Sequence, residues 1–106
     1  MALRLRYEAL AQKQVDVANG FSTDWQIAAE KFRSLEDDKN LFPPYFLAPV
    51  VRMEIAQNAP VVAILAKVGE LIDNPTMQEL NRQVEVDKRE PRRVASDFLK
   101  QKGLSN

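Results

Sequence analysis

The chain has 106 residues, a usual length for one domain, and its 45% hydrophobic and 28% charged residues are ordinary for a globular protein. Fifteen basic residues balance fifteen acidic ones, which argues against nucleic-acid binding. Cysteine and histidine are absent, which excludes disulfides, zinc fingers, thiol nucleophiles and imidazole bases. We therefore expect no catalytic residues, no metal site and no cofactor, and an enzyme is the least favoured class.

Two features bear on location. Residues 1–14 carry charges and lack the apolar core of a signal peptide. The most apolar stretch, 59–72, is too short and too charged to cross a bilayer. Taken by itself, the chain is expected to be cytoplasmic.

The first quarter of the chain predicts a helix, a strand and a second helix. Residues 7–14 form a short helix or a helix end, and 15–21 alternate like a strand. Residues 22–32 begin a helix, because Thr23 followed by Gln26 is a capping-box pattern. The apolar stripe of that helix consists of Trp25, Ala28 and Phe32.

The middle of the chain is rich in proline. Residues 33–38 predict a short strand or a loop, and 46–53 are extended at least up to Pro49. Pro43 and Pro44 cannot lie inside a helix or a central strand. They either form a turn with no further role or hold Tyr45 rigidly so that a ligand can bind its ring.

The C-terminal half predicts three amphipathic helices. The first begins near Pro60 and has an apolar stripe through Ile72, and the second begins at Asn74 or, with a competing capping box, at Thr76. The third begins at Pro91 and ends at Gly103 in the left-handed conformation. The fold class is therefore α/β, with a few short strands followed by three C-terminal helices. So few strands make a marginal sheet, so the chain is interpreted as part of an α/β unit.

Eight short motifs, in this order and spacing, carry a family resemblance across the whole chain. They are YEAL (7–10), VDV (15–17), FSTD (21–24), LEDDK (35–39), FPPY (42–45), APVVR (48–52), MQELN (77–81) and FLKQKGL (98–104). With them the sequence resembles the C-terminal portion of the ABC-transporter substrate-binding proteins for glycine betaine, choline and related quaternary amines, the osmoprotectants.

The resemblance implies the fold. Members of the family are two-lobed type II periplasmic-binding-protein clamshells, with the ligand in the cleft between the lobes. This chain would be a helix-rich partial lobe, with 1–36 as the end of the second lobe and the return crossing, and 37–106 as the C-terminal part of the first lobe.

The resemblance also implies the site. The family holds a trimethylammonium group in a cage of aromatic rings, because such a cation has no N–H to donate and each ring is worth about 1–2 kcal/mol. Tyr45 and Phe21 stand at cage positions, and the family has tyrosine where Phe21 stands here. Thr23 and Trp25 are also candidate ligand-binding residues. For Phe21, packing in the core is an open alternative, and for Trp25 it is the favoured interpretation. Asp37 is adjacent to a second aspartate, which favours a solvated turn over a metal pair.

Two functions follow. One is a fragment of an osmoprotectant-binding protein of an ABC importer, whose affinity for quaternary amines is weak or absent without its other half. Its location is periplasmic or extracellular by family, and its partners are the transporter's membrane subunits. The alternative is a stand-alone, self-associating structural protein without a ligand. In either case we expect a homo-oligomer with Trp25, Phe32 or the stripe of 61–72 at the interface.

Overall fold

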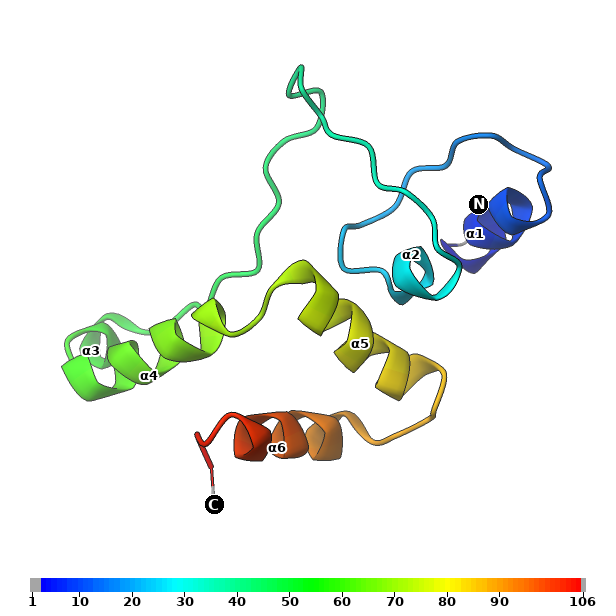
Figure 1. The fold of residues 1–106 in the computed structure, drawn as a ribbon. Helices are drawn as coiled ribbons and strands as arrows, with labels where there is room; N and C mark the ends of the chain where they lie inside the picture. Colours follow the sequence, from blue (N-terminus) through cyan, green and yellow to red (C-terminus); the bar gives the residue numbers. More distant parts are fainter. Residues whose placement is uncertain (1–2, 106) are drawn as a thin grey trace. The chain divides into compact units, whose positions relative to one another are not determined.

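The computed structural model describes residues 3–105, and over that range it contains helices and no strand (Figure 1). The helices are α1 (Leu3–Ala11), α2 (Trp25–Ala29), α3 (Met53–Ala56), α4 (Ala59–Glu70), α5 (Asn74–Glu85) and α6 (Pro91–Gln101). None of them, within the described range, has the length and apolar character that a bilayer crossing requires.

The chain divides into two compact units. Unit 1 lies within Met1–Ser34 and Asn74–Asn106, and unit 2 is Leu35–Asp73. Unit 1 therefore joins the two ends of the sequence, and it holds α1, α2, α5 and α6.

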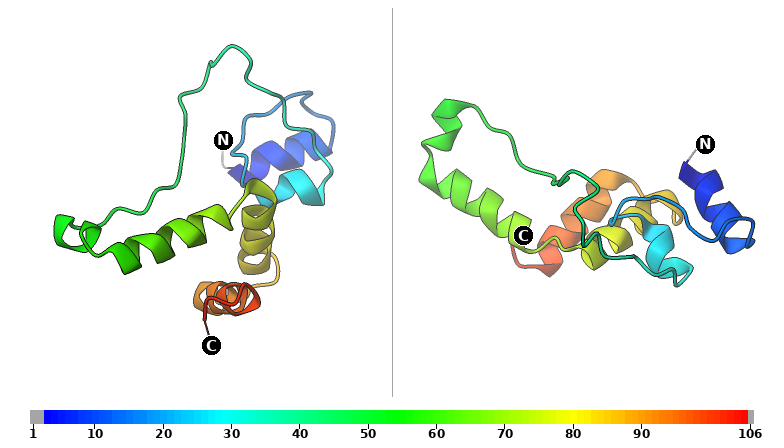
Figure 2. Two further views of the ribbon diagram at one scale, coloured as in Figure 1. Left: turned by 60° about the vertical axis from the view of Figure 1, so that its left-hand side comes forward. Right: turned by 90° about the horizontal axis from the view of Figure 1, so that it is seen from above.

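Helix α5 is the centre of unit 1. It contacts both α2 and α6, and the views of Figure 2 show it between them. The buried apolar side chains of the described residues all lie in this unit: Tyr7, Ala9, Val94 and Phe98. The Tyr7 ring also stacks on Phe32, with 6.1 Å between ring centroids and 15° between planes.

The end of α6 follows the sequence prediction. Gly103 has φ +70°, its N–H donates to Lys100 O at 2.9 Å, and the Leu104 N–H donates to Leu99 O at 2.9 Å. These two bonds define a Schellman motif, in which a left-handed glycine satisfies carbonyls at the helix end.

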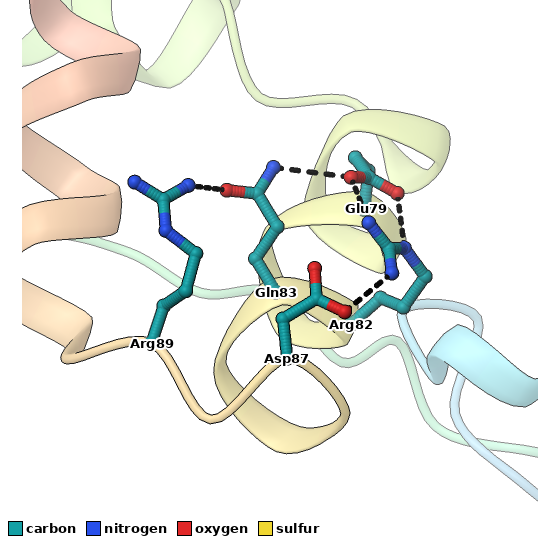
Figure 3. A network of polar contacts seen from close by, with 5 residues as sticks. All are labelled: Glu79, Arg82, Gln83, Asp87 and Arg89. Atoms are coloured by element: carbon teal, nitrogen blue, oxygen red, sulfur yellow. Dashed lines mark hydrogen bonds and ion pairs between the residues drawn. The ribbon is translucent and has the colours of Figure 1, made fainter.

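The loop between α5 and α6 is held by a polar network on the surface (Figure 3). The Arg82 guanidinium donates to both oxygens of Glu79, at 2.8 and 2.9 Å, and to Asp87 at 3.0 Å. Gln83 bonds to Glu79 and accepts from Arg89. The charged run 87–93 is exposed. Two of its residues, Asp87 and Arg89, also hold this loop through their hydrogen bonds.

Unit 2 has little core. Its α3 and α4 contact each other, and Asn58 caps α4 by accepting from the Val61 N–H at 3.4 Å. In the apolar stripe of α4, Val61, Leu65 and Val68 are half-buried and Ile64 is exposed. None of residues 35–73, all of which the structure describes, is fully buried.

The sequence predictions fail in two places. The capping box of Thr23 and Gln26 is wrong, because Asp24 is the N-cap residue of α2 and Gln26 is buried. The strand expected in 15–21 is absent from the described residues. Residues 33–38, given as a short strand or a loop, form no strand, and 46–52 have no regular structure before a short helix, α3, begins at Met53. A strand is stable only when another strand pairs with it, and these segments do not pair with one another.

Candidate ligand-binding site

Three of the four predicted site residues lie close together in the sequence of unit 1: Phe21 and Thr23 on one turn, and Trp25 at the start of α2. The Asp24 N–H donates to Phe21 O at 2.9 Å, which closes the turn, and the Asp24 carboxylate accepts from the Phe21 N–H at 2.9 Å. The same carboxylate oxygen accepts from the Tyr7 hydroxyl at 2.7 Å. Asp24 thus fixes the backbone on which Phe21 stands and ties it to α1.

Side chains of α5 hold the turn from the other side. Gln78 Nε2 donates to Ser22 O at 2.7 Å, and Asn81 Nδ2 donates to Thr23 O at 3.0 Å. The Ser22 hydroxyl donates to Asn74 Oδ1 at 3.3 Å. Two carbonyls of the turn are therefore satisfied by amide side chains one helical turn apart, which fixes the turn's register on α5.

Gly20 makes room for this arrangement. A Cβ atom on Gly20 would lie 2.0 Å from the Tyr7 hydroxyl oxygen and 3.2 Å from an Asp24 carboxylate oxygen. Burial, with the Asp24 carboxylate adding to it, raises the pKa of the Tyr7 hydroxyl above its ordinary value. Tyr7 therefore stays neutral and remains a donor at physiological pH.

Trp25 is half-buried at the start of α2. Its indole N–H donates to a Glu85 carboxylate oxygen at 2.8 Å, so it links α2 to the end of α5. It also lines a hollow of about 540 Å³ together with Tyr7, Gln26 and Glu85. Packing and a hydrogen bond thus account for its position in unit 1.

Tyr45 belongs to unit 2 and follows a turn built around Asp37. The two carboxylate oxygens of Asp37 accept from the N–H groups of Leu41 and Phe42, both at 2.8 Å. These two bonds lower the pKa of Asp37, the one from Phe42 most strongly. The turn expected at Asp37 is confirmed, and it leads directly into Pro43 and Pro44.

Both candidate cage rings are exposed. Phe21 is 50% exposed and Tyr45 is 84% exposed. Phe21 lies on the turn in which the Asp24 carboxylate accepts its backbone N–H. Tyr45 follows the turn in which the Asp37 carboxylate accepts the N–H groups of Leu41 and Phe42. No group of acidic side chains in residues 3–105 is arranged to hold a metal ion.

Sequence reasoning did not assign roles to the residues that position the rings. Asp24 was visible as the last letter of the FSTD motif, and Asp37 as the first aspartate before the prolines. Tyr7 belongs to the YEAL motif, and Gln78 and Asn81 belong to MQELN, but their roles depend on contacts with residues far away in the sequence, which no local pattern indicates.

Comparison with known proteins identifies the family. Residues 1–101 match the model of the substrate binding domain of the ABC-type glycine betaine transport system. The chain belongs to this family of substrate-binding domains, as the sequence motifs predict.

The relatives are longer than this chain. It is 42% identical to the glycine-betaine-binding protein of Pseudomonas aeruginosa, over 94% of the chain and 32% of that protein. It is 41% identical to the ergothioneine transport permease/ergothioneine binding protein EgtU of Helicobacter pylori, over 98% of the chain and 19% of that protein. The carnitine transport binding protein OpuCC of Listeria monocytogenes is 37% identical, over 93% of the chain and 32% of that protein. The chain thus spans about a fifth to a third of these proteins.

A solved structure agrees with the fold. The crystal structure of a glycine betaine/carnitine/choline ABC transporter protein matches 98% of this chain and 39% of its own chain, with TM-score 0.88 and 37% identity. Over the described range this chain is helix-rich and shows no strand, which agrees with the expected helix-rich partial lobe but not with its few short strands. The alternative of a stand-alone structural protein receives no support from these comparisons.

Proposed function

We propose that this chain supplies part of the lining of the site for a quaternary amine in the substrate-binding component of an ABC importer. Two relatives are named for glycine betaine and carnitine, and the matched structure for glycine betaine, carnitine and choline. These ligands share a trimethylammonium group, which ring faces attract by cation–π interaction.

The observation that carries the proposal is the pair of exposed rings on fixed backbone. A ring binds a cation well only if its orientation costs little entropy on binding. Asp24 fixes the backbone of Phe21, and Asp37 with Pro43 and Pro44 fixes the backbone before Tyr45. Both rings keep large exposed surfaces, as cage walls require.

Thr23 and Trp25 are the other proposed site residues of unit 1. Thr23 is half-buried on the same turn as Phe21, with its carbonyl satisfied by Asn81, so its hydroxyl is the group left for recognition. Trp25 is placed by its bond to Glu85, and we assign it a supporting role at the start of α2, directly after this turn.

The same family membership suggests the context. We place 1–36 at the end of one lobe of a type II clamshell and 37–106 in the other lobe, outside the membrane in the periplasm or extracellular space, with the transporter's membrane subunits as partners. The isolated chain exposes apolar side chains in both units, and we expect it to self-associate.

The test is a chimera. The stretch of the Pseudomonas aeruginosa relative that this chain matches is replaced by this chain, and glycine betaine, choline and carnitine are titrated by calorimetry. Tyr45→Leu should weaken binding about 5–30-fold, because one ring contributes about 1–2 kcal/mol. Phe21→Tyr should bind as tightly or more tightly, since a phenol ring is the better cation acceptor.

The control is Phe46→Leu, because Phe46 is adjacent to Tyr45 and has the same exposed fraction, 84%. We expect it to leave affinity unchanged. The isolated chain should show no saturation below millimolar ligand. An unchanged affinity for Tyr45→Leu, or tight binding by the isolated monomer, would contradict the proposal.

A further inference from the structure

Asp24 stands at the N-cap position of α2, but its side chain does not cap that helix. Its backbone is extended, with φ −69° and ψ 125°, as an N-cap residue requires, and yet the carboxylate makes no bond to an N–H group of the helix. An aspartate at this position ordinarily accepts from the N–H two or three residues further on. Here one carboxylate oxygen accepts instead from the Phe21 N–H and the Tyr7 hydroxyl. The carboxylate therefore serves the turn before the helix.

Helix α2 is held in place by other contacts. It has five residues, and a helix of that length depends on packing for its stability. It packs on α5, and the indole of its first residue, Trp25, bonds to Glu85 at the end of that helix. The start of α2 is therefore fixed without the carboxylate of Asp24.

The turn binds both backbone polar groups of Phe21 to a single residue. The Phe21 N–H donates to the Asp24 carboxylate, and the Phe21 carbonyl accepts from the Asp24 N–H, each at 2.9 Å. The bond to the carboxylate is charge-assisted, and such bonds are about twice as strong as neutral ones. Rotation of either peptide unit beside Phe21 breaks one of the two bonds. The direction in which the Phe21 side chain leaves the backbone is therefore fixed.

Tyr7 fixes the position of the carboxylate in turn. Its hydroxyl donates at 2.7 Å to the same oxygen that accepts the Phe21 N–H. Tyr7 is 7% exposed and its ring stacks on Phe32, so the hydroxyl has little freedom to move. The contacts thus run from the buried ring of Tyr7 through Asp24 to Phe21, whose ring is half-exposed.

We propose that Asp24 and Tyr7 are positioning residues of the cation site, and that they act on the ligand through the ring of Phe21 alone. A ring whose backbone is already fixed loses less entropy when a ligand orders it, so the affinity is higher. The inference rests on the proposed function. It adds that the affinity depends on a hydroxyl group of α1 that is not itself part of the proposed cage.

The test is a double-mutant cycle in the chimera described above, with glycine betaine titrated by calorimetry. Tyr7→Phe keeps the buried ring and removes the hydroxyl, and it should raise the Kd about 2–10-fold, the effect of ordering one side chain. With Phe21→Leu already present, Tyr7→Phe should leave the Kd unchanged within about 1.5-fold, because the ring through which it acts is gone. Asp24→Ala should follow the same pattern with a larger loss, and Asp24→Asn, whose amide oxygen can still accept, should restore part of the affinity.

Amide exchange in the same chimera without ligand separates positioning from helix capping. Asp24→Ala should speed exchange at Phe21 at least about tenfold, because its N–H loses its acceptor. Exchange at Gln26 and Ile27, whose N–H groups a capping side chain would hold, should change by less than about twofold. Faster exchange at Gln26 and Ile27 but not at Phe21 would identify Asp24 as an ordinary cap and overturn the inference.

Val94→Ala is the control for stability, because Val94 is buried on α6 and takes no part in these hydrogen bonds. It should lower the free energy of unfolding and leave the Kd unchanged. An unchanged Kd with Tyr7→Phe would overturn the inference, and so would a loss of affinity that is the same with and without the Phe21 ring; both results leave Phe21 in the cage. Phe21→Leu without any effect on the Kd would instead remove Phe21 from the proposed function, and the inference with it.

Discussion

Gly20→Ala should destabilise unit 1 strongly although it adds one methyl group. The new Cβ would lie 2.0 Å from the Tyr7 hydroxyl oxygen and 3.0 Å from the ring carbon that bears it. The hydroxyl must move by about 1 Å to reach a normal contact, and Tyr7 is only 7% exposed and stacked on Phe32. That movement breaks its bond to the Asp24 carboxylate, and loss of such a charge-assisted bond costs about 1.5–3 kcal/mol.

Urea denaturation, followed by the fluorescence of Trp25, measures the free energy of unfolding. Trp25 is the single tryptophan, and it directly follows Asp24. Gly69→Ala is the matched control, because a Cβ there meets nothing within 4 Å and Gly69 lies inside α4. Alanine at that position should stabilise the helix by about 0.5–1 kcal/mol.

A double-mutant cycle isolates the contact. With Tyr7→Phe the colliding oxygen is gone, so Gly20→Ala should cost at least about 1 kcal/mol less than in the original chain. If Gly20→Ala alone lowers the free energy of unfolding by less than about 0.5 kcal/mol, or costs the same with phenylalanine at position 7, the reasoning is refuted.

Three further outcomes are expected. Asp37→Asn should speed amide exchange at Leu41 and Phe42, because it weakens the hydrogen bonds that the carboxylate accepts from them. Because the folded-state pKa of Asp37 is lowered, these bonds should also weaken in the unaltered chain as the pH falls below about 3.8. Equal exchange rates in the variant and the unaltered chain would contradict this. Glu79, held by Arg82, has its pKa lowered to about 2, so its contribution is complete above about pH 4.5 and is lost as the pH falls through 2. This contribution to the free energy of unfolding should be below about 1 kcal/mol, because the Glu79–Arg82 pair is exposed. NMR titration of the Glu79 carboxyl measures its pKa, and a value near 4.5 would contradict the prediction. Gly103→Ala should cost about 1 kcal/mol by urea denaturation, because alanine disfavours φ +70°, and a neutral result would show that the α6 end does not need its left-handed residue.

The sequence predicts the helices that have both a periodic apolar stripe and a local end signal. Helix α4 begins one residue before Pro60. Helix α6 begins at Pro91 and ends at Gln101, and Gly103 is the left-handed residue that follows it, as expected. Each of these signals lies within a few residues of the helix end that it determines, so the helix end can be predicted without knowing any distant contact.

The failures have a common physical reason. Thr23 and Gln26 form a good local capping pattern, but α5 holds the turn 21–24 through Gln78 and Asn81, and α2 begins one residue later, with Asp24 as the N-cap. A strand depends on a partner that can lie far away in the sequence, and the alternation of apolar and polar residues does not show whether such a partner is present. Of the candidate site, the motifs indicate Phe21 and Tyr45. Asp24 bonds Phe21 locally, but the contact that ties this turn to α1, between Tyr7 and Asp24, spans seventeen residues.

The shared carboxylate oxygen of Asp24 has an evolutionary consequence. It serves Tyr7 on α1 and the backbone of Phe21 at once, and Gly20 is the space that lets them meet. These positions cannot drift independently: an exchange at one is tolerated only when the others already suit it. We therefore expect them to be inherited as a block, with epistasis between the tyrosine, the glycine and the aspartate.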